Sequence, residues 1–101
     1  MDLIKLSKEN NYLEKQAEYD CRGIHISFKN TPGYSGMVWV EINNEKRIDK
    51  SIGYFRDAIT SDPNVLRIPV LIKKRDMVKV VFPGLSGDLK IESFELLILD
   101  M

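Results

Sequence analysis

Residues 76 to 99 read DMVKVVFPGLSGDLKIESFELLIL and carry the clearest structural signal in the chain. Apolar and polar residues alternate up to Phe82, a Pro-Gly pair interrupts them, and the alternation resumes at Leu89. Because successive side chains of a strand point to opposite faces, the pattern predicts two strands joined by a turn. The alternation changes phase between Ile91 and Phe94. A β-bulge at Glu92-Ser93 explains this change, since it lets both halves of the last strand face one core.

The same period of two extends back along most of the chain. It predicts strands that start near Ile24, Val38, Ile48, Leu66, Val78 and Leu89, separated by turn-rich segments. The third of these strands is weaker and includes Ile52 and Tyr54, and the segment FRDAITSDPN that follows has room for one helical turn. Pro69 donates no backbone hydrogen bond, so its strand is expected at a sheet edge or with a bulge.

Residues 1–22 carry a weaker signal than residues 23–99, which form the main sandwich. The first segment is either an N-terminal arm or a first strand, and Ser7 is a candidate N-cap for one short helix. A helix and an extended arm both fit these residues. With six or seven strands and no long helix, the 101 residues predict a single all-β domain, an antiparallel β-sandwich or barrel.

Composition excludes several classes of protein. Fifteen basic and fifteen acidic residues give a formal net charge of zero, which favours no polyanionic partner. One cysteine excludes an intrachain disulfide and a cysteine-cluster zinc site. Residues 1–7 contain no apolar run of the length that a signal peptide or membrane span needs. The single cysteine fits the cytoplasm or a trimmed extracellular domain, so the compartment stays open.

The sequence contains few residues that are suited to catalysis. Cys21 and His25 are the one local pair of nucleophile and base, and on a regular strand they point to the same side about 13 Å apart. We therefore expect a non-catalytic protein without a cofactor. Structural calcium is the one candidate ion, bound by Asp57 and Asp62, although Asp62 before Pro63 is also typical of a turn.

The order of the strands indicates where a ligand could bind. If the strands run alternately up and down, the segments NTPGYSG, FRDAITSDPN and PGLSGD share one end of the sandwich. That end carries Tyr34, Phe55, Arg56, Asp57 and Asp88, a mixture of aromatic faces and hydrogen-bonding groups that suits sugars. The alternative is structural, with Phe55 closing the core and Tyr34 on a loop.

Two apolar features suggest a protein interface instead. Trp39 is out of phase with Val38 and Val40, so it faces away from the core, either free for a partner or under the N-terminal arm. Leu97 and Leu99 lie on the face opposite Phe94, Leu96 and Ile98. A strand that is apolar on both faces is either central between two layers or part of a subunit contact, so a homo-oligomer is one expectation.

The hairpin tip KKRD, with Lys79 nearby, is the densest basic patch. Basic tips beside sheet aromatics occur in oligonucleotide-binding barrels. Glu45 and Asp76 lie at the same end, and a hairpin tip is an ordinary place for lysine. Nucleic-acid binding is accordingly the third function that the sequence suggests.

The segments GIHISFKN, GYSGMVWVEINNE and VLRIPVLIKKRDMVKVVFPGLSGDLKIESFELLIL, in this order, resemble the galactose-binding-like jelly rolls. The likeness covers residues 23–99 and is greatest to non-catalytic carbohydrate-binding modules. It implies a sugar site on loops at one end, with Asp88 as the polar residue before the last strand and Tyr34 with Tyr54 or Phe55 as the aromatics. Related jelly rolls also serve as protein-contact modules in virion and secretion assemblies. Carbohydrate is thus the first ligand expected, and assembly through protein contacts is the alternative.

Overall fold

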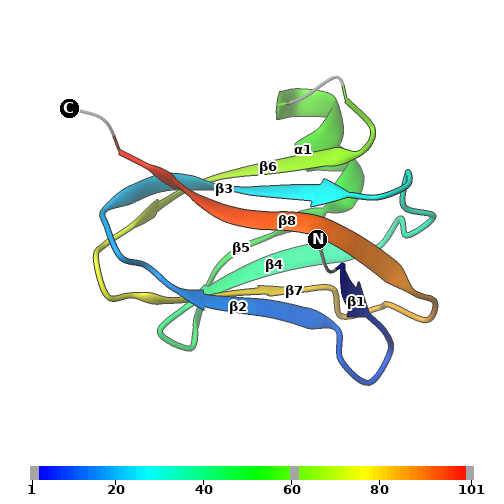
Figure 1. Cartoon of the computed structure of the whole chain (residues 1–101), viewed down its shortest axis with the longest axis horizontal. Coiled ribbons are helices and arrows are strands. Elements are labelled where there is room, and N and C mark those ends of the chain that lie inside the picture. Colours follow the sequence, from blue (N-terminus) through cyan, green and yellow to red (C-terminus); the bar gives the residue numbers. More distant parts are fainter. Residues whose placement is uncertain (1–2, 60–61, 100–101) are drawn as a thin grey trace.

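The protein is an all-β sandwich of two four-stranded antiparallel sheets (Figure 1). The computed structural model describes residues 3–59 and 62–99, and the side chains of these residues except 56–59. One sheet has the order β1 (Ile4–Leu6), β8 (Leu89–Ile98), β3 (Cys21–Phe28) and β6 (Val65–Ile72). The other has the order β2 (Tyr12–Gln16), β7 (Met77–Val81), β4 (Met37–Ile42) and β5 (Glu45–Ser51). A single described helix, α1 (Ile52–Ile59), lies between β5 and β6 in the chain.

The core lies between the two sheets and follows the alternation of the sequence. In the first sheet Ile24 and Ile26 of β3 stand opposite Leu96 and Phe94 of β8. In the second sheet Val40 of β4 stands opposite Val80 of β7. The fully buried side chains from both sheets include Phe28, Leu6, Ile24, Ile26, Ile42, Leu66, Ile68, Ile91 and Val38, and Phe82, directly after β7, is also fully buried.

The predicted bulge in the last strand is present. Ser27 of β3 pairs with Ser93, while the next residue, Phe28, pairs with Ile91, so Glu92 has no opposite residue. Ile91 and Phe94 are consequently both buried although three positions separate them. Pro69 also lies where the sequence places it, on β6, an edge strand that pairs with β3 alone, and beside a register shift at Cys21/Gly23.

The N-terminal segment is extended and belongs to both sheets. β1 pairs with β8 in the first sheet and β2 pairs with β7 in the second. Ser7 does not cap a helix; it forms a turn with Asn10 through two backbone hydrogen bonds of 3.0 and 3.2 Å. Of the two alternatives for this segment, the helix is wrong because Leu13 and Ala17 are buried when the chain is extended.

Helix α1 replaces part of a predicted strand. The sequence pattern placed Ile52 and Tyr54 in register with Ile48, but β5 ends at Ser51. The Ser51 hydroxyl accepts a hydrogen bond from the Tyr54 amide at 3.3 Å, which is the geometry of an N-cap. Ile52 and Phe55, three residues apart on the helix, are 0% and 1% exposed. The helix is also longer than the single turn expected.

The loops are distributed between the two ends as strand parity predicted. At one end the Phe28 amide donates to the Asn64 carbonyl at 2.8 Å, and the Gly84 amide donates to the Tyr34 hydroxyl at 3.3 Å. These bonds tie together the loops around residues 29–36, 62–64 and 82–88. At the other end the β4–β5 hairpin turns at Asn43 and Asn44, which have φ values of 53° and 69°.

The two lateral sides of the sandwich, where the edge strands of the two sheets border each other, are covered to different extents. Helix α1 contacts β5 and β6 and covers the side that these two edge strands border (Figure 1). On the opposite side the edge strands are β1 and β2. β1 has three residues and pairs with Leu89–Ile91 only, so it covers less than half of β8.

Asp76 organises the turn between β6 and β7. Its carboxylate accepts hydrogen bonds from the Lys73 amide at 2.9 Å and the Asn43 side-chain amide at 3.0 Å. These two bonds, in that order, hold the pKa of Asp76 below its usual value. The Asn43 side chain in turn accepts a bond from the Met77 amide at 2.9 Å, which joins the β4–β5 hairpin to the β6–β7 turn.

Replacing Phe55 by alanine should lower the free energy of unfolding by about 3 to 5 kcal/mol, because a fully buried ring is lost and a cavity is left under α1. The neighbouring Tyr54 is 51% exposed and provides the control. Tyr54→Ala should cost no more than about 1 kcal/mol. Urea unfolding followed by circular dichroism measures both, and equal costs would show that α1 is not anchored through Phe55.

Asp76 should make the free energy of unfolding fall more steeply as the pH is lowered. Its pKa is lower in the folded chain than in the unfolded chain. Its contribution is therefore complete above the unfolded pKa of about 4 and is lost as pH falls through the folded value. Asp76→Asn should flatten the dependence of the unfolding midpoint on pH between about pH 5 and 2. Glu14→Gln, the same change at an exposed position of β2, is the control, and identical acid limbs for both variants would contradict the expectation.

Candidate functional site

Tyr34 is used by the fold itself. Its hydroxyl donates to the Met37 carbonyl at 2.6 Å and accepts from the Gly84 amide at 3.3 Å. Its ring is half-buried and packs edge-on against Phe82, with the ring centroids 5.9 Å apart. Both the polar tip and one edge of this side chain are therefore engaged in joining the β3–β4 loop to the β7–β8 loop.

The three predicted site residues on α1 differ in accessibility. Phe55 is 1% exposed, so its ring belongs to the core and offers no face to a ligand. Tyr54 is 51% exposed, packs edge-on against Phe55 at 5.4 Å, and has the Lys50 ammonium 5.5 Å from its ring centroid. The side chain of Arg56 lies outside those that the structure describes.

Asp88 lies in a small hollow at the loop end. The hollow has a volume of about 140 Å³ and is lined by Phe28, Asn30, Thr31, Pro32, Gly33, Asp88, Leu89 and Lys90. Asp88 forms an ion pair with Lys5 at 3.2 Å, and both side chains are exposed. Thr31 is held by a hydrogen bond from its hydroxyl to the Asn64 side-chain oxygen at 2.7 Å. Tyr34 and Tyr54 are not among the residues that line this hollow.

The loop at Asp62, the candidate calcium site, forms a turn. One Asp62 carboxylate oxygen accepts a hydrogen bond from the Asn64 amide at 2.9 Å, the pattern of an Asx turn. The Asp57 side chain is not among those described. Across the described residues, no group of three or more histidine, cysteine, aspartate or glutamate side chains is placed to hold a metal ion.

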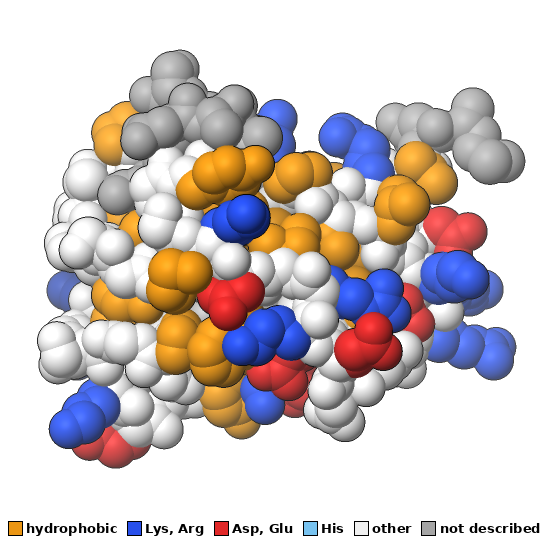
Figure 2. Space-filling view, turned by 180° about the vertical axis from the view of Figure 1, so that it is seen from behind, with side chains coloured by type: hydrophobic (Ala, Val, Ile, Leu, Met, Phe, Trp, Pro, Cys, Tyr) orange, Lys and Arg blue, Asp and Glu red, His pale blue; other side chains and the backbone are white. Residues whose placement is uncertain are grey.

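Trp39 lies on the outer face of the second sheet. The N-terminal arm does not cover it, because β2 is part of the same sheet and β7 separates it from β4. The indole nitrogen donates to Glu41 at 2.8 Å, and the Lys46 ammonium lies 3.9 Å from the ring centroid. In the space-filling view from behind, apolar surface alternates with charges of both signs (Figure 2).

Cys21 and His25 do not form a site. Cys21 is 3% exposed and its thiol donates to the Tyr19 carbonyl at 3.2 Å, whereas His25 is half-buried on the outer face. The expectation that both point to one side is wrong, because the register shift between Cys21 and Gly23 reverses the alternation. Burial, and secondarily the charge of Asp20, raise the pKa of the Cys21 thiol, which disfavours its nucleophilic form.

The predicted hairpin at KKRD is wrong, because β6 and β7 belong to different sheets and this basic turn crosses from one sheet to the other. The turn is interleaved with carboxylates. The Lys74 amide donates to an Asp20 carboxylate oxygen at 2.9 Å, and Asp76 accepts from the Lys73 amide at the same turn. Arg75 adopts a φ of 78° and its amide donates to the Ala17 carbonyl at 2.7 Å. The acidic groups at this tip reduce the positive potential that a nucleic acid needs.

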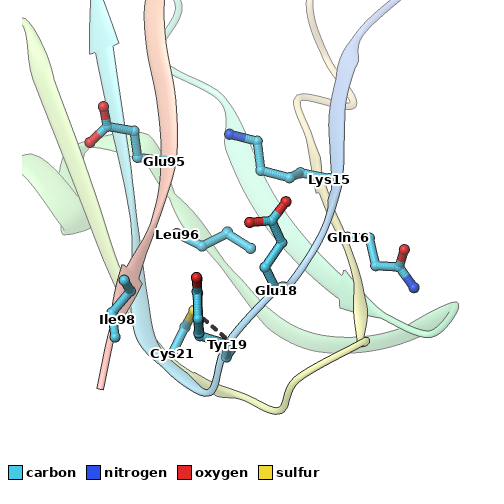
Figure 3. A pocket seen from close by; sticks show the side chains of 8 residues that line it. All are labelled: Lys15, Gln16, Glu18, Tyr19, Cys21, Glu95, Leu96 and Ile98. Carbon is cyan, nitrogen blue, oxygen red and sulfur yellow. Dashed lines mark hydrogen bonds between the residues drawn. The ribbon is translucent and has the colours of Figure 1, made fainter. Parts of the chain in front are cut away.

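A larger groove lies on the open side of the sandwich (Figure 3). Its volume is about 420 Å³, and it is lined by Lys15, Gln16, Glu18, Tyr19, Cys21, Glu95, Leu96 and Ile98. β2 and the β2–β3 connection form one wall, and the C-terminal half of β8 forms the other (Figure 3). Apart from the doubly apolar end of β8, the sequence contains no motif that marks this groove.

The wall formed by β8 includes an unpaired strand edge. On its β3 side, the Leu99 amide donates to the Asp20 carbonyl at 2.9 Å. Because backbone groups of successive strand residues point to alternate sides, those of Leu96 and Ile98 point to the opposite, open side. On that side the Lys15 ammonium donates a hydrogen bond to the Phe94 carbonyl. In the described part of the chain, neither strand pairing nor any other backbone hydrogen bond engages Leu96 and Ile98 on that side.

Comparison with known proteins adds no assignment: no protein-family model, no curated protein and no solved structure matches the chain. In the described part of the chain, no helix has the length and apolarity to cross a membrane.

Tyr34→Phe should lower the free energy of unfolding by about 1 to 2 kcal/mol, because the hydroxyl makes one hydrogen bond as a donor and one as an acceptor. Tyr54→Phe removes the same group from an exposed ring and should stay within about 0.5 kcal/mol of the native chain. Urea unfolding distinguishes them. If the two variants were equally stable, Tyr34 would be free to serve a ligand instead.

Proposed function

We propose that this domain is a non-catalytic binding module that contacts other proteins through the open side of its sandwich. The observation that carries this proposal is the unpaired edge of β8 beside a groove whose lining includes the apolar side chains of Tyr19, Leu96 and Ile98. An unpaired edge offers backbone donors and acceptors in a row, and an extended segment of another chain is the ligand that matches such a row.

Exposed apolar side chains surround the same edge. Tyr19 is 57% exposed and Ile98 is 52% exposed at the groove, and Leu99 is 40% exposed on the outer face of the sheet. Leu97, which shares that outer face, is half-buried. Apolar residues on both sides of one strand edge favour a protein contact over a small polar ligand.

The strand order supports a role of this kind. The orders β1-β8-β3-β6 and β2-β7-β4-β5 are those expected when two nested Greek keys fold over one another, which supports a jelly roll. Jelly rolls include capsid and lectin domains, and therefore both assembly and sugar binding occur on this architecture. Fold alone does not choose between them, and the choice depends on the sites.

Carbohydrate binding is the second candidate, favoured by the hollow at the loop end. Asp88, Asn30 and Thr31 line it and supply the hydrogen-bonding groups that sugar hydroxyls need. The proposal ranks lower because the hollow is about a third of the volume of the groove and its residues do not include the predicted tyrosines. Asp88 is moreover partnered by Lys5.

Selection of unstructured peptides from a display library on the immobilised domain tests the leading proposal. Selected peptides should bind about tenfold more weakly, or worse, to Ile98→Lys, which places a charge on the apolar wall of the groove. Leu71→Lys is the matched control, because Leu71 is 74% exposed on β6 at the far edge of the same sheet. It should change the affinity less than twofold.

A glycan array probed in parallel separates the two candidates. Binding of the native domain to a glycan, abolished by Asp88→Ala with no selected peptide, would overturn the protein-binding proposal and establish the second candidate. Peptides that bind Ile98→Lys as tightly as the native domain would also contradict the proposed surface. Unfolding curves of each variant show whether a loss of binding is a loss of fold.

A further inference from the structure

We propose that the partner at this edge is a second copy of the same chain, with the two β8 strands paired antiparallel so that Leu96 of each copy lies opposite Ile98 of the other. This inference rests on the proposed function and specifies its partner. The contact it describes is isologous, with the same residues contributed by both copies about a two-fold axis at Leu97.

The backbone of the open edge is complementary to itself. Leu96 and Ile98 each present one N–H and one C=O to the open side, as the bond from Leu99 on the other side of β8 requires. In an antiparallel pair, two residues that face each other exchange both of their hydrogen bonds. By symmetry, Leu96 of each copy pairs with Ile98 of the other. All the N–H and C=O groups that these two residues present to the open side are then hydrogen-bonded.

Lys15 selects this register. Its ammonium donates a hydrogen bond to the Phe94 carbonyl and lies 5.0 Å from the Phe94 ring centroid. An incoming strand is thereby kept from the next position along the edge, and pairing is restricted to Leu96 and Ile98. β1 occupies the same side of β8 further on, at Leu89–Ile91, so an added strand extends that row and does not displace it.

The side chains agree with the same register. Leu97 would face Leu97 of the second copy as a non-hydrogen-bonded pair, in which the side chains of an antiparallel ladder lie closest. Leu97 is half-buried and Leu99 is 40% exposed on that face. The two-fold axis therefore joins the apolar outer faces at the point where each is partly uncovered.

The charges along the groove are of both signs. Lys15 lies beside Phe94, and the Glu18 side chain points back towards Lys15, while Tyr19 and Cys21 lie beside Ile98 at the other end (Figure 3). Since the chain has zero formal net charge, no overall repulsion opposes association.

Sedimentation equilibrium of the native chain over a range of concentrations provides the first test. The expected result is a reversible increase from the mass of one chain to twice that mass. Ile98→Lys should raise the dimer dissociation constant about tenfold or more, and Leu71→Lys should leave it within about twofold. A native chain that stays monomeric at every concentration overturns the inference.

Cysteine cross-linking tests the register itself. Leu97→Cys should form an intermolecular disulfide under mild oxidation, because non-hydrogen-bonded antiparallel partners have Cα atoms about 4.5 Å apart, within the range that a disulfide spans. Leu71→Cys is the control, and the buried Cys21 is retained in both variants so that its background is measured in the native chain. Cross-linking of Leu71→Cys as fast as Leu97→Cys overturns the register.

The two proposals fail differently. Peptides that bind the native domain but not Ile98→Lys, together with a strictly monomeric chain, would remove the second copy as partner and leave the proposed function intact. Dimers that form equally well with Ile98→Lys would place the contact on another face and would also overturn this inference. A folded native chain that neither binds a selected peptide nor dimerises would contradict both proposals.

Discussion

The sandwich depends on one irregular pairing, the register shift between β3 and β8 at Glu92. Without this extra residue, a strand that buries Ile91 would turn Phe94 to the solvent, since the side-chain period of a strand is two. Each large apolar side chain moved from water to the core contributes about 1.5 to 3 kcal/mol. The bulge lets one long strand serve the core on both sides of the phase change, and β8 can then span the sheet beside β3.

The length of β8 in turn creates the open edge. β3 is long enough to pair with most of β8, but β1 contributes only three residues on the other side. The opposite side of the sandwich does not have this problem, because α1 packs against both β5 and β6. The asymmetry between the two sides follows from where the chain places a buried helix, anchored by Ile52 and Phe55, and where it places a short strand.

The sequence predicted those features that depend on alternation and on turn residues. The strands from Ile24 to Leu89, the bulge at Glu92, the edge position of Pro69 and the shared ends of the loops all follow from period two and from backbone chemistry. Helix α1 was missed because Ile52 and Tyr54 also fit a strand. The signal that could have found it was Ser51 as an N-cap, with Ile52 and Phe55 spaced by three.

The sites were harder to predict because they depend on tertiary contacts. The hydroxyl of Tyr34 is engaged by the distant Gly84, and no local pattern indicates that bond. The groove exists because β1 ends before the second half of β8, a consequence of pairing between residues more than eighty positions apart. The alternation in residues 96–99 indicated an unusual strand, but it did not show on which side that strand lacked a neighbour.

The short length of the open edge explains how such a surface is compatible with a discrete fold. A long unpaired strand is a template for unlimited association, and proteins limit it with lysines and with short edges. Here both devices are present, since Lys15 covers the Phe94 carbonyl and β1 covers Leu89–Ile91. Along the described edge, the backbone groups of Leu96 and Ile98 lie beyond Phe94, on the side away from β1, and are left open. Two residues provide too little pairing for a fibril, yet they suffice to fix the register of one strand whose apolar side chains supply the remaining contact.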